Sequence, residues 1–337
     1  MCSDIHTRHA RRLGLVLTAP DRLTITRVGD VDSGFTYQRV NGRGPVPMRR
    51  CRAIDGLALP PAWTEVRIAA RDNAHLQAIG RDAAGRLQYR YHERWTQVRE
   101  AVKARRLLRF GKALPRIRAA VAAAMKGPAD ARDTVIATAV DLIDKGHLRI
   151  GSERYAAHGT RGATTLMGRH VRIEKGEVRL AFRAKSGKAA RLSFRDRRLA
   201  RKVAALKARP GRLFTFRDAD GSWRAVGARH VNDWLSDIAG MPVSAKDFRT
   251  FAGSAIALEA LDEADDAPLR NRVPAAMRAV AERLRNTPAV ARASYVLPEV
   301  LEAEESDPDI RRRALRGRRR KGLSRAETAL MRILEAR

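Results

Sequence analysis

The sequence predicts an α+β protein with a β-rich N-terminal part and a mostly helical remainder that carries a small antiparallel sheet. Three observations support this fold class. In the first hundred residues, short runs of β-branched and aromatic residues alternate with glycine, proline and aspartate. From Glu93 onward, apolar residues recur at helical intervals instead. Between residues 162 and 194, short apolar runs return and glycine-bearing turns separate them.

The N-terminal part is expected to contain a series of short strands. They cover residues 23–26, 35–38, 66–68, 75–79 and 86–91. The Pro60–Pro61 pair forces an extended turn before the third strand, and residues 82–85 form a hairpin loop before the last. Period two places Tyr89 and Tyr91 on one face of that last strand.

The helical part is expected to begin near Glu93, with the hinge between domains close to the start of its first helix. Pro115 is expected to begin a second helix, which ends at Gly127. A third helix spans residues 133–144, so Arg149 follows just past a helix end, where its side chain can point into a cleft. Further helices are expected at residues 195–208, 229–238, 245–261 and 273–285.

The small sheet is expected from residues 162–166, 178–182 and 191–194, with a flexible turn that carries Lys185 and Lys188. The chain therefore divides into a β-rich N-terminal domain, a mostly helical domain and a charged tail, first acidic and then basic. Their expected bounds are residues 1–96, 97–302 and 303–337. Ser324 and Glu327 have the spacing of a capping box, which indicates a closing helix over residues 324–336.

The charge balance indicates a polyanionic partner. Lys and Arg number 68 against 37 Asp and Glu, which gives a formal net charge of +31. An arginine-rich proteome raises the charge of a protein without any functional cause, but it hardly explains an excess of this size. Nucleic acid is the commonest polyanion that basic proteins bind. Nucleic acid is therefore the expected class of partner.

Cysteine and histidine usage argues against disulfides and structural metal. Cys2 and Cys51 are too few for a disulfide framework, which favours a reducing compartment. The 8 histidines show no metal-ligand spacing, and no structural metal or cofactor is expected. The apolar run at residues 13–17 is too short for a secretory signal, and none approaches the roughly 18 residues that span a bilayer. We expect a cytoplasmic, nucleoid-associated protein.

Two interpretations fit the hairpin strand 86–91. Gln88 can pair with adenine in a major groove, while Arg86 and the hydroxyls of Tyr89 and Tyr91 can reach phosphates. Alternatively, the strand is an ordinary amphipathic one whose tyrosines lie in the core. The residues alone favour the second interpretation.

The stretch from Arg285 to Tyr295 can present a single hydroxyl. Asn286-Thr287-Pro288 opens a turn in which the proline suits the first position of a helix. Tyr295 follows nine residues after Asn286, a little over two helical turns later. A phenol placed like this among basic residues could attack a phosphodiester. The residues of this stretch by themselves, however, favour a surface tyrosine on a basic helix.

Attack of a phenol on a phosphodiester needs particular partners. The phenol has an ordinary pKa of about 10 and must lose its proton in an electropositive site. Arginines stabilise the phosphorane because their planar fork donates two aligned hydrogen bonds and stays charged. A lysine can protonate the departing 5′ oxygen. None of these steps requires a divalent ion.

Several segments occur in an order that resembles one enzyme family. They are Pro60-Pro61-Ala62-Trp63, residues 85–91, Leu148-Arg149-Ile150-Gly151, residues 182–188, residues 246–251 and residues 285–295. Together they resemble the type IB DNA topoisomerases of the short viral and bacterial branch. The resemblance runs from about Ser33 to Glu299.

The resemblance implies a DNA clamp that relaxes supercoiled duplex DNA as a monomer, without ATP or metal. Tyr295 would attack the phosphate and form a 3′-phosphotyrosyl link, with Arg149 and Arg249 on the non-bridging oxygens. Lys185 would be the general acid, with Lys188 as the alternative if the loop register differs. The resemblance implies further site or DNA contacts at Lys246, Asn286, Tyr155, Gln88, Tyr89 and Tyr91.

The sequence departs from the family pattern at three positions. Asn286 replaces a histidine of the viral and eukaryotic members; it can donate a hydrogen bond but carries no charge. Ala184 stands where a glycine usually precedes the lysine, and Arg285 replaces a small residue. Two other functions remain open: a tyrosine recombinase, which uses a similar residue set, and a non-enzymatic architectural DNA-binding protein.

Overall fold

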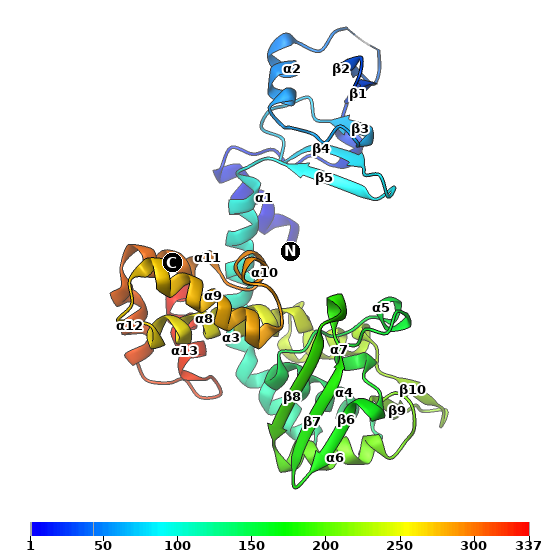
Figure 1. Ribbon diagram of the computed structural model, residues 1–337, viewed down its shortest axis with the longest axis vertical. Coiled ribbons are helices and arrows are strands. Elements are labelled where there is room, and N and C mark those ends of the chain that lie inside the picture. Colours follow the sequence, from blue (N-terminus) through cyan, green and yellow to red (C-terminus); the bar gives the residue numbers. More distant parts are fainter. Residues whose placement is uncertain (1, 43, 337) are drawn as a thin grey trace. The chain divides into compact units, whose positions relative to one another are not determined.

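The computed structural model describes residues 2–42 and 44–336. The chain forms two compact units, Met1–Lys103 and Ala104–Arg337 (Figure 1). The first is built around an antiparallel sheet and the second is mostly helical, so the predicted α+β class is confirmed. Within the described residues, no helix is both long and apolar enough to cross a bilayer.

The first unit contains a five-stranded sheet in the order β2-β1-β3-β4-β5. Every neighbouring pair of strands is antiparallel, and all five predicted strands are present. Their bounds are β1 Ile25–Asp30, β2 Gly34–Arg39, β3 Thr64–Ile68, β4 Leu76–Arg81 and β5 Leu87–Tyr91. The sequence interpretation missed two helices, α1 Cys2–Arg12 and α2 Met48–Asp55. The fully buried Ile54 of α2 packs with Ile25 and Ile68 of the sheet, so tertiary burial stabilises this short helix.

Helix α3, Trp95–Ala124, is continuous, and the expected start of a second helix at Pro115 is wrong. An interior proline removes one backbone hydrogen bond and usually ends or kinks a helix. Here Phe110 and Leu114 before the proline and Ile117 and Val121 after it are all buried in one core. Burial on both sides of Pro115 therefore outweighs the local cost.

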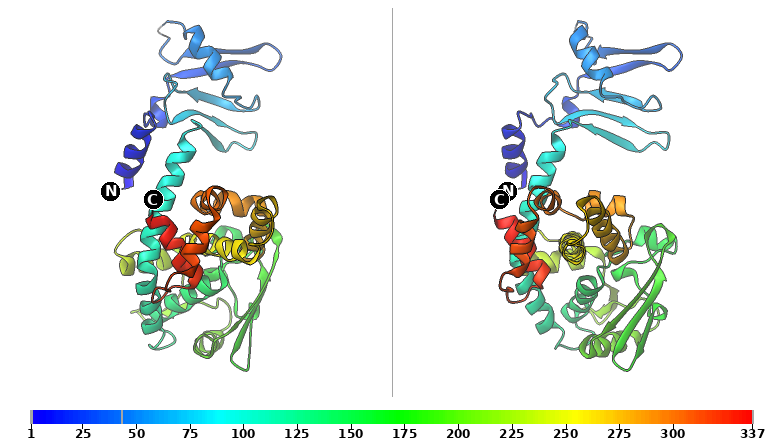
Figure 2. Two further views of the ribbon diagram at one scale, coloured as in Figure 1. Left: turned by 90° about the vertical axis from the view of Figure 1, so that its left-hand side faces the viewer. Right: turned by 60° about the vertical axis from the view of Figure 1, so that its left-hand side comes forward.

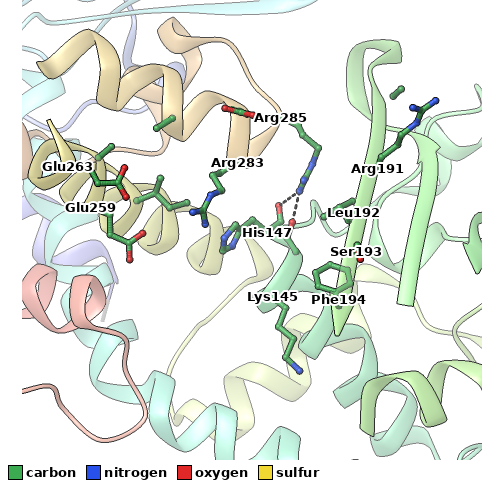
Figure 3. Close-up of a pocket in the computed structure, with 16 residues that line it drawn as sticks. Lys145, His147, Arg191, Leu192, Ser193, Phe194, Glu259, Glu263, Arg283 and Arg285 are labelled. Atoms are coloured by element: carbon green, nitrogen blue, oxygen red, sulfur yellow. Dashed lines mark hydrogen bonds between the residues drawn. The ribbon is translucent and has the colours of Figure 1, made fainter. Parts of the chain in front are cut away.

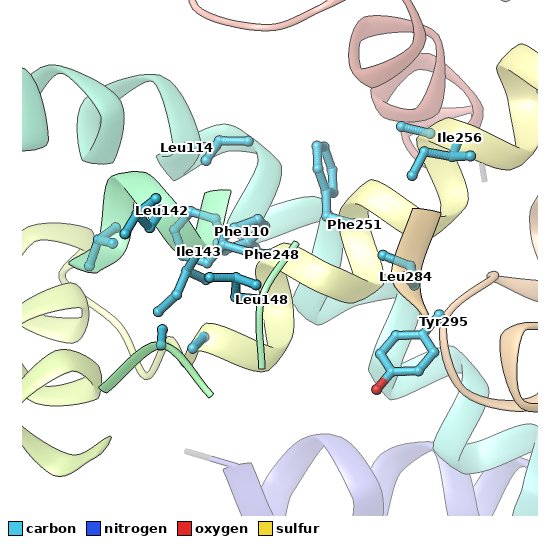
Figure 4. Close-up of a cluster of buried hydrophobic side chains, with 14 of the residues drawn as sticks. Phe110, Leu114, Leu142, Ile143, Leu148, Phe248, Phe251, Ile256, Leu284 and Tyr295 are labelled. Atoms are coloured by element: carbon cyan, nitrogen blue, oxygen red, sulfur yellow. The ribbon is translucent and has the colours of Figure 1, made fainter. Parts of the chain in front are cut away.

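The core of the second unit surrounds helices α4, Arg132–Gly146, and α8, Ala245–Glu263. Both have buried residues along nearly their whole length. Phe110 of α3 packs edge-on against Phe248 and Phe251 of α8 (Figure 4). The other helices are α5 Glu153–Ala157, α6 Arg197–Lys207, α7 Ala228–Ala239, α9 Leu269–Leu284, α10 Pro288–Ser294, α11 Pro298–Ser306, α12 Pro308–Arg316 and α13 Arg325–Glu335.

The small antiparallel sheet of the second unit has the order β6-β7-β8. Its strands are β6 Val171–Glu174, β7 Glu177–Arg183 and β8 Ala189–Arg195, and a separate hairpin pairs β9 Thr215–Arg217 with β10 Trp223–Ala225. The strand expected at residues 162–166 is wrong. Residues Ala163–Thr165 form a 3₁₀ turn instead, because their amides bond to the carbonyls of Arg149, Ile150 and Gly162.

Residues 303–337, expected as a charged tail, contribute to the core of the second unit. Leu315, Leu330 and Leu334 are buried with the rest of that core. Arg311 is fully buried and pairs with Glu304, Asp262 and Asp265. The closing helix and its Ser324–Glu327 capping box are confirmed. Figures 1 and 2 show α12 and α13 on one side of this unit and the three-stranded sheet on the other.

Candidate active site

Tyr295 is fixed at the end of the short helix α10. Thr287 caps the helix by accepting a hydrogen bond from the amide of Val290 at 3.3 Å, and Pro288 occupies its first position. The tyrosine side chain is 9% exposed and packs at the edge of the core. Its backbone carbonyl accepts a hydrogen bond from Ser254 Oγ at 3.3 Å. In Figure 4 the hydroxyl points away from the labelled apolar side chains, so this end of the phenol does not face the core.

Arg249 lies beside this phenol. Its guanidinium carbon is 4.8 Å from the centroid of the Tyr295 ring. The side chain is 3% exposed and donates hydrogen bonds to two backbone carbonyls, those of His147 and, at 3.0 Å, Leu284. The guanidinium is therefore held by neutral acceptors and keeps its charge available for an anion.

Arg149 reaches the same region from the end of α4. Its Nη2 donates to Asn286 Oδ1, which fixes the orientation of the Asn286 amide. The side-chain amide nitrogen of Asn286, Nδ2, is buried and has no hydrogen-bond partner among residues 2–42 and 44–336. A buried donor without a partner is costly, and a phosphate oxygen would satisfy it.

The arginines and a nearby lysine control the ionisation of the phenol. Burial by itself raises the pKa of Tyr295, but the positive charge of Arg249 and the hydrogen bond between Arg249 and the phenol lower it. Together with the charges of Arg149 and Lys246, they outweigh burial. The pKa of Tyr295 consequently lies below its ordinary value, so the phenolate forms at lower pH than for a free tyrosine. Lys246 itself is exposed in the first turn of α8.

The two candidate lysines are placed differently. Both are exposed in the turn between β7 and β8. Lys188 Nζ donates to the backbone carbonyl of Asn286 at 3.2 Å, and Lys185 has no such contact among the described residues. Residues 149, 188, 246, 249, 286 and 295 thus converge, although 146 positions separate the first from the last. Tyr155 lies apart from this contact network on α5, where it is 55% exposed.

The candidate DNA contacts of the first unit lie on its surface. Tyr89 and Tyr91 are 46% and 37% exposed and stack on each other at 6.1 Å between ring centroids. The interpretation that placed these tyrosines in the core is therefore wrong. Gln88 Nε2 and Arg86 Nε both donate to Asp82 Oδ2 at 2.8 Å. This carboxylate orients both side chains at the hairpin.

The sequence interpretation missed two groups of contacts around the segment that carries Arg149. Residues Ala163 and Thr164 hold the Arg149 loop through backbone hydrogen bonds of 2.8 Å to the carbonyls of Arg149 and Ile150. Gly162 permits this approach, since a Cβ there would lie 2.5 Å from Gly151 N and 2.6 Å from Arg149 O. The second group is Arg285 with the carbonyls of Gly146 and His147. The sequence signals for them were weak: Gly162 two residues before a pair of threonines, and Arg285 in place of a small residue.

Gly162→Ala is expected to reduce, more than tenfold, the DNA cleavage that the family resemblance implies for this site, because a displacement of about 1 Å at a reacting group can cost about 100-fold in rate. The added methyl meets only backbone atoms, so the Arg149 loop must shift. Gly168→Ala is the matched control, since its Cβ would make an ordinary contact of 3.6 Å with Lys207. Single-turnover cleavage and thermal unfolding of both variants check this prediction. Equal cleavage rates in the two variants would contradict it.

Comparisons with known proteins agree with this geometry. Residues 92–309 match the family described as eukaryotic DNA topoisomerase I, catalytic core. Residues 34–82 match bacterial DNA topoisomerase IB, N-terminal domain. The chain belongs to the type IB DNA topoisomerases. The DNA topoisomerase 1B of Acanthamoeba polyphaga mimivirus is 31% identical over 288 residues, which cover 82% of this chain and 86% of the viral protein.

All the converging residues of this topoisomerase lie inside the catalytic-core match. Gln88, Tyr89 and Tyr91 fall between the two matched segments. The family makes the chain an enzyme that acts on DNA, so the recombinase and architectural alternatives are set aside.

Proposed function

We propose that this topoisomerase relaxes supercoiled duplex DNA by cutting one strand transiently through a 3′-phosphotyrosyl link to Tyr295. The main support is the convergence of the phenol with Arg249 and Arg149, which lowers the pKa of Tyr295. In this mechanism Tyr295 loses its phenolic proton to solvent and its Oη attacks the phosphorus. The bond from phosphorus to the 5′ oxygen breaks, and Lys185 donates a proton to that oxygen. The free 5′-hydroxyl strand rotates and then attacks the phosphotyrosine to reseal the duplex.

The two arginines and Asn286 would stabilise the negative charge of the transition state. Arg149 and Arg249 would donate to the non-bridging oxygens, because their planar forks match a phosphate. The unpartnered amide nitrogen of Asn286 would add one neutral hydrogen bond. Because the phosphodiester bond energy is kept in the covalent link, the cycle needs no ATP, and the guanidinium charges take the part that a divalent ion plays in other phosphoryl-transfer enzymes.

Duplex binding would use both units. The exposed Tyr89 and Tyr91, with Arg86 and Gln88, offer aromatic and hydrogen-bonding groups to DNA, and the exposed Tyr155 offers another phenol. The excess positive charge predicts binding that weakens steeply with salt. We propose a monomeric, nucleoid-associated enzyme.

A plasmid assay tests the proposed function. Supercoiled plasmid is incubated with the protein in EDTA and without ATP, and reactions are stopped with detergent to trap any covalent adduct. Relaxation together with an adduct on the peptide that contains Tyr295 supports the proposal. Salt-sensitive binding with neither relaxation nor adduct would refute it, as would a strict requirement for ATP or magnesium.

The general acid can be identified with a modified leaving group. Lys185→Ala is expected to slow cleavage about 10² to 10⁴-fold, the usual contribution of a general acid. A substrate with sulfur at the scissile 5′ position should restore that rate, because a thiolate leaves without a proton. Lys188→Ala is expected to lose less, since this lysine bonds to the Asn286 carbonyl, and sulfur should not restore it. If the sulfur substrate restored the cleavage rate of Lys188→Ala and not that of Lys185→Ala, Lys188 would be the general acid.

A further inference from the structure

Arg285 occupies a backbone conformation that favours glycine. Helix α9 ends in a Schellman motif, in which the amide of Asn286 donates to Ala281 O at 2.8 Å and that of Arg285 donates to Glu282 O at 3.1 Å. The motif requires a left-handed residue, and Arg285 has φ 55° and ψ 54°. Glycine adopts this conformation without steric cost, whereas arginine does not. An arginine at this position therefore costs some stability, which contacts of its side chain can offset.

The side chain of Arg285 crosses to the end of α4. Its Nη2 donates to the carbonyl of Gly146 and, at 3.5 Å, to that of His147 (Figure 3). His147 also has left-handed backbone, with φ 49°, where α4 stops. The carbonyls at a helix C-terminus carry partial negative charge and lack partners within the helix. Arg285 satisfies them at the point where the chain continues to Arg149.

These contacts close a ring through the active site. The His147 carbonyl that accepts from Arg285 also accepts from Arg249. Arg249 in turn donates to the carbonyl of Leu284, the residue just before Arg285. The ring joins the end of α4, helix α8 and the turn between α9 and α10, and these segments carry Arg149, Arg249 and Asn286.

The ring is positively charged. Within residues 2–42 and 44–336, no carboxylate forms an ion pair with Arg149, Arg249 or Arg285. Burial, and then the charges of Arg249 and Arg149, lower the pKa of Arg285 to about 10, so it remains protonated near neutral pH. Burial lowers the pKa of His147 to about 4, so its imidazole is neutral near neutral pH. The two arginines contact the backbone carbonyl of His147, not this ring.

We propose that Arg285 is a positioning residue of this active site: its guanidinium fastens the end of α4 to the turn between α9 and α10 and holds Arg149 and Asn286 in place against Tyr295. The proposal rests on the proposed function. On its other side, Arg285 lines a pocket of about 900 Å³ that also includes Lys145, Arg191 and Glu259 (Figure 3). Free guanidinium can therefore reach the position of the side chain when the side chain is removed.

Arg285→Gly distinguishes the effect of the Arg285 side chain from the effect of its left-handed backbone. Glycine relieves the left-handed conformation, which offsets part of the cost of leaving the Gly146 and His147 carbonyls without this donor. Tm should therefore change by only a few degrees, while the rate of adduct formation on a duplex substrate should fall about 10- to 100-fold. The Kd for duplex DNA should change much less than this rate. Guanidinium ion at millimolar concentration should restore part of the rate, which a general loss of stability would not allow. Arg285→Lys, which keeps one charged donor, should retain more activity than the glycine variant.

Two matched controls isolate the effect. Lys175→Gly relieves another left-handed residue, with φ 48°, in the turn between β6 and β7, and should leave the cleavage rate unchanged. Arg283→Ala removes an exposed positive charge from the last turn of α9 and should change the rate by no more than about twofold. Wild-type cleavage by Arg285→Gly, or a loss that guanidinium leaves unaltered, would overturn the proposal. Failure of the wild-type protein to form any adduct would instead refute the proposed function.

Discussion

Tyr295→Phe is expected to abolish both plasmid relaxation and the covalent protein–DNA adduct, while duplex binding persists. The substitution removes only the hydroxyl that would attack the phosphate, and no other group on the ring can replace it as nucleophile. The ring stays packed at the edge of the core, so the loss in stability should be limited to one hydrogen bond, about 0.5–1.5 kcal/mol. Plasmid relaxation, adduct trapping and fluorescence anisotropy with a labelled duplex measure the three properties separately.

Tyr37→Phe is the matched control for this variant. The Tyr37 hydroxyl donates to Asp55 Oδ1 at 2.7 Å in the first unit, so the same atom is removed from a tyrosine outside the catalytic core. Relaxation by the Tyr37 variant should match that of the wild type. An adduct formed by Tyr295→Phe would place the nucleophile on another residue and remove the basis of the mechanism.

Arg249→Ala is expected to lower the cleavage rate by about 10³-fold, since one preorganised donor to a transition-state oxyanion contributes about 10² to 10³. The variant also changes the ionisation of the phenol. Arg249 is the main charge that opposes the effect of burial, so its removal raises the pKa of Tyr295. The phenolate then forms only at higher pH, so the pH at which the cleavage rate rises should shift to a higher value. Single-turnover cleavage measured across a pH series checks both effects.

Stability must be separated from chemistry in this variant. Removal of Arg249 leaves the buried carbonyls of His147 and Leu284 without this donor, so thermal unfolding should be measured alongside. Arg249→Lys keeps a positive charge near Tyr295 but loses the planar fork, so it should shift the pH profile less and still cleave slowly. Arg106→Ala is the matched control. Arg106 lies on α3, is half exposed and pairs with Asp247, which is on α8 like Arg249. An unshifted pH profile for Arg249→Ala would show that this arginine does not set the pKa of Tyr295.

Much of the fold and of the site could be predicted because their signals are local. The Asn286-Thr287-Pro288 turn, the short helix after it and the position of Tyr295 at the helix end depend on neighbouring residues. The strands of the first unit and the capping box of α13 are similarly encoded in short stretches. Pro115 shows the limit of such signals: its local preference is to start a helix, but burial on both sides keeps α3 continuous.

The residues alone established the excess of positive charge, the order of the basic segments and one tyrosine at the end of a short helix. Only the tertiary structure decided that Arg249 lies against that tyrosine, that Lys188 contacts the Asn286 backbone, and that Arg285 fastens two helix ends. Helix and turn preferences act over a few residues. The three contacts join positions that are 46, 98 and 139 residues apart, so they depend instead on how the apolar faces of α4, α8 and α9 pack together.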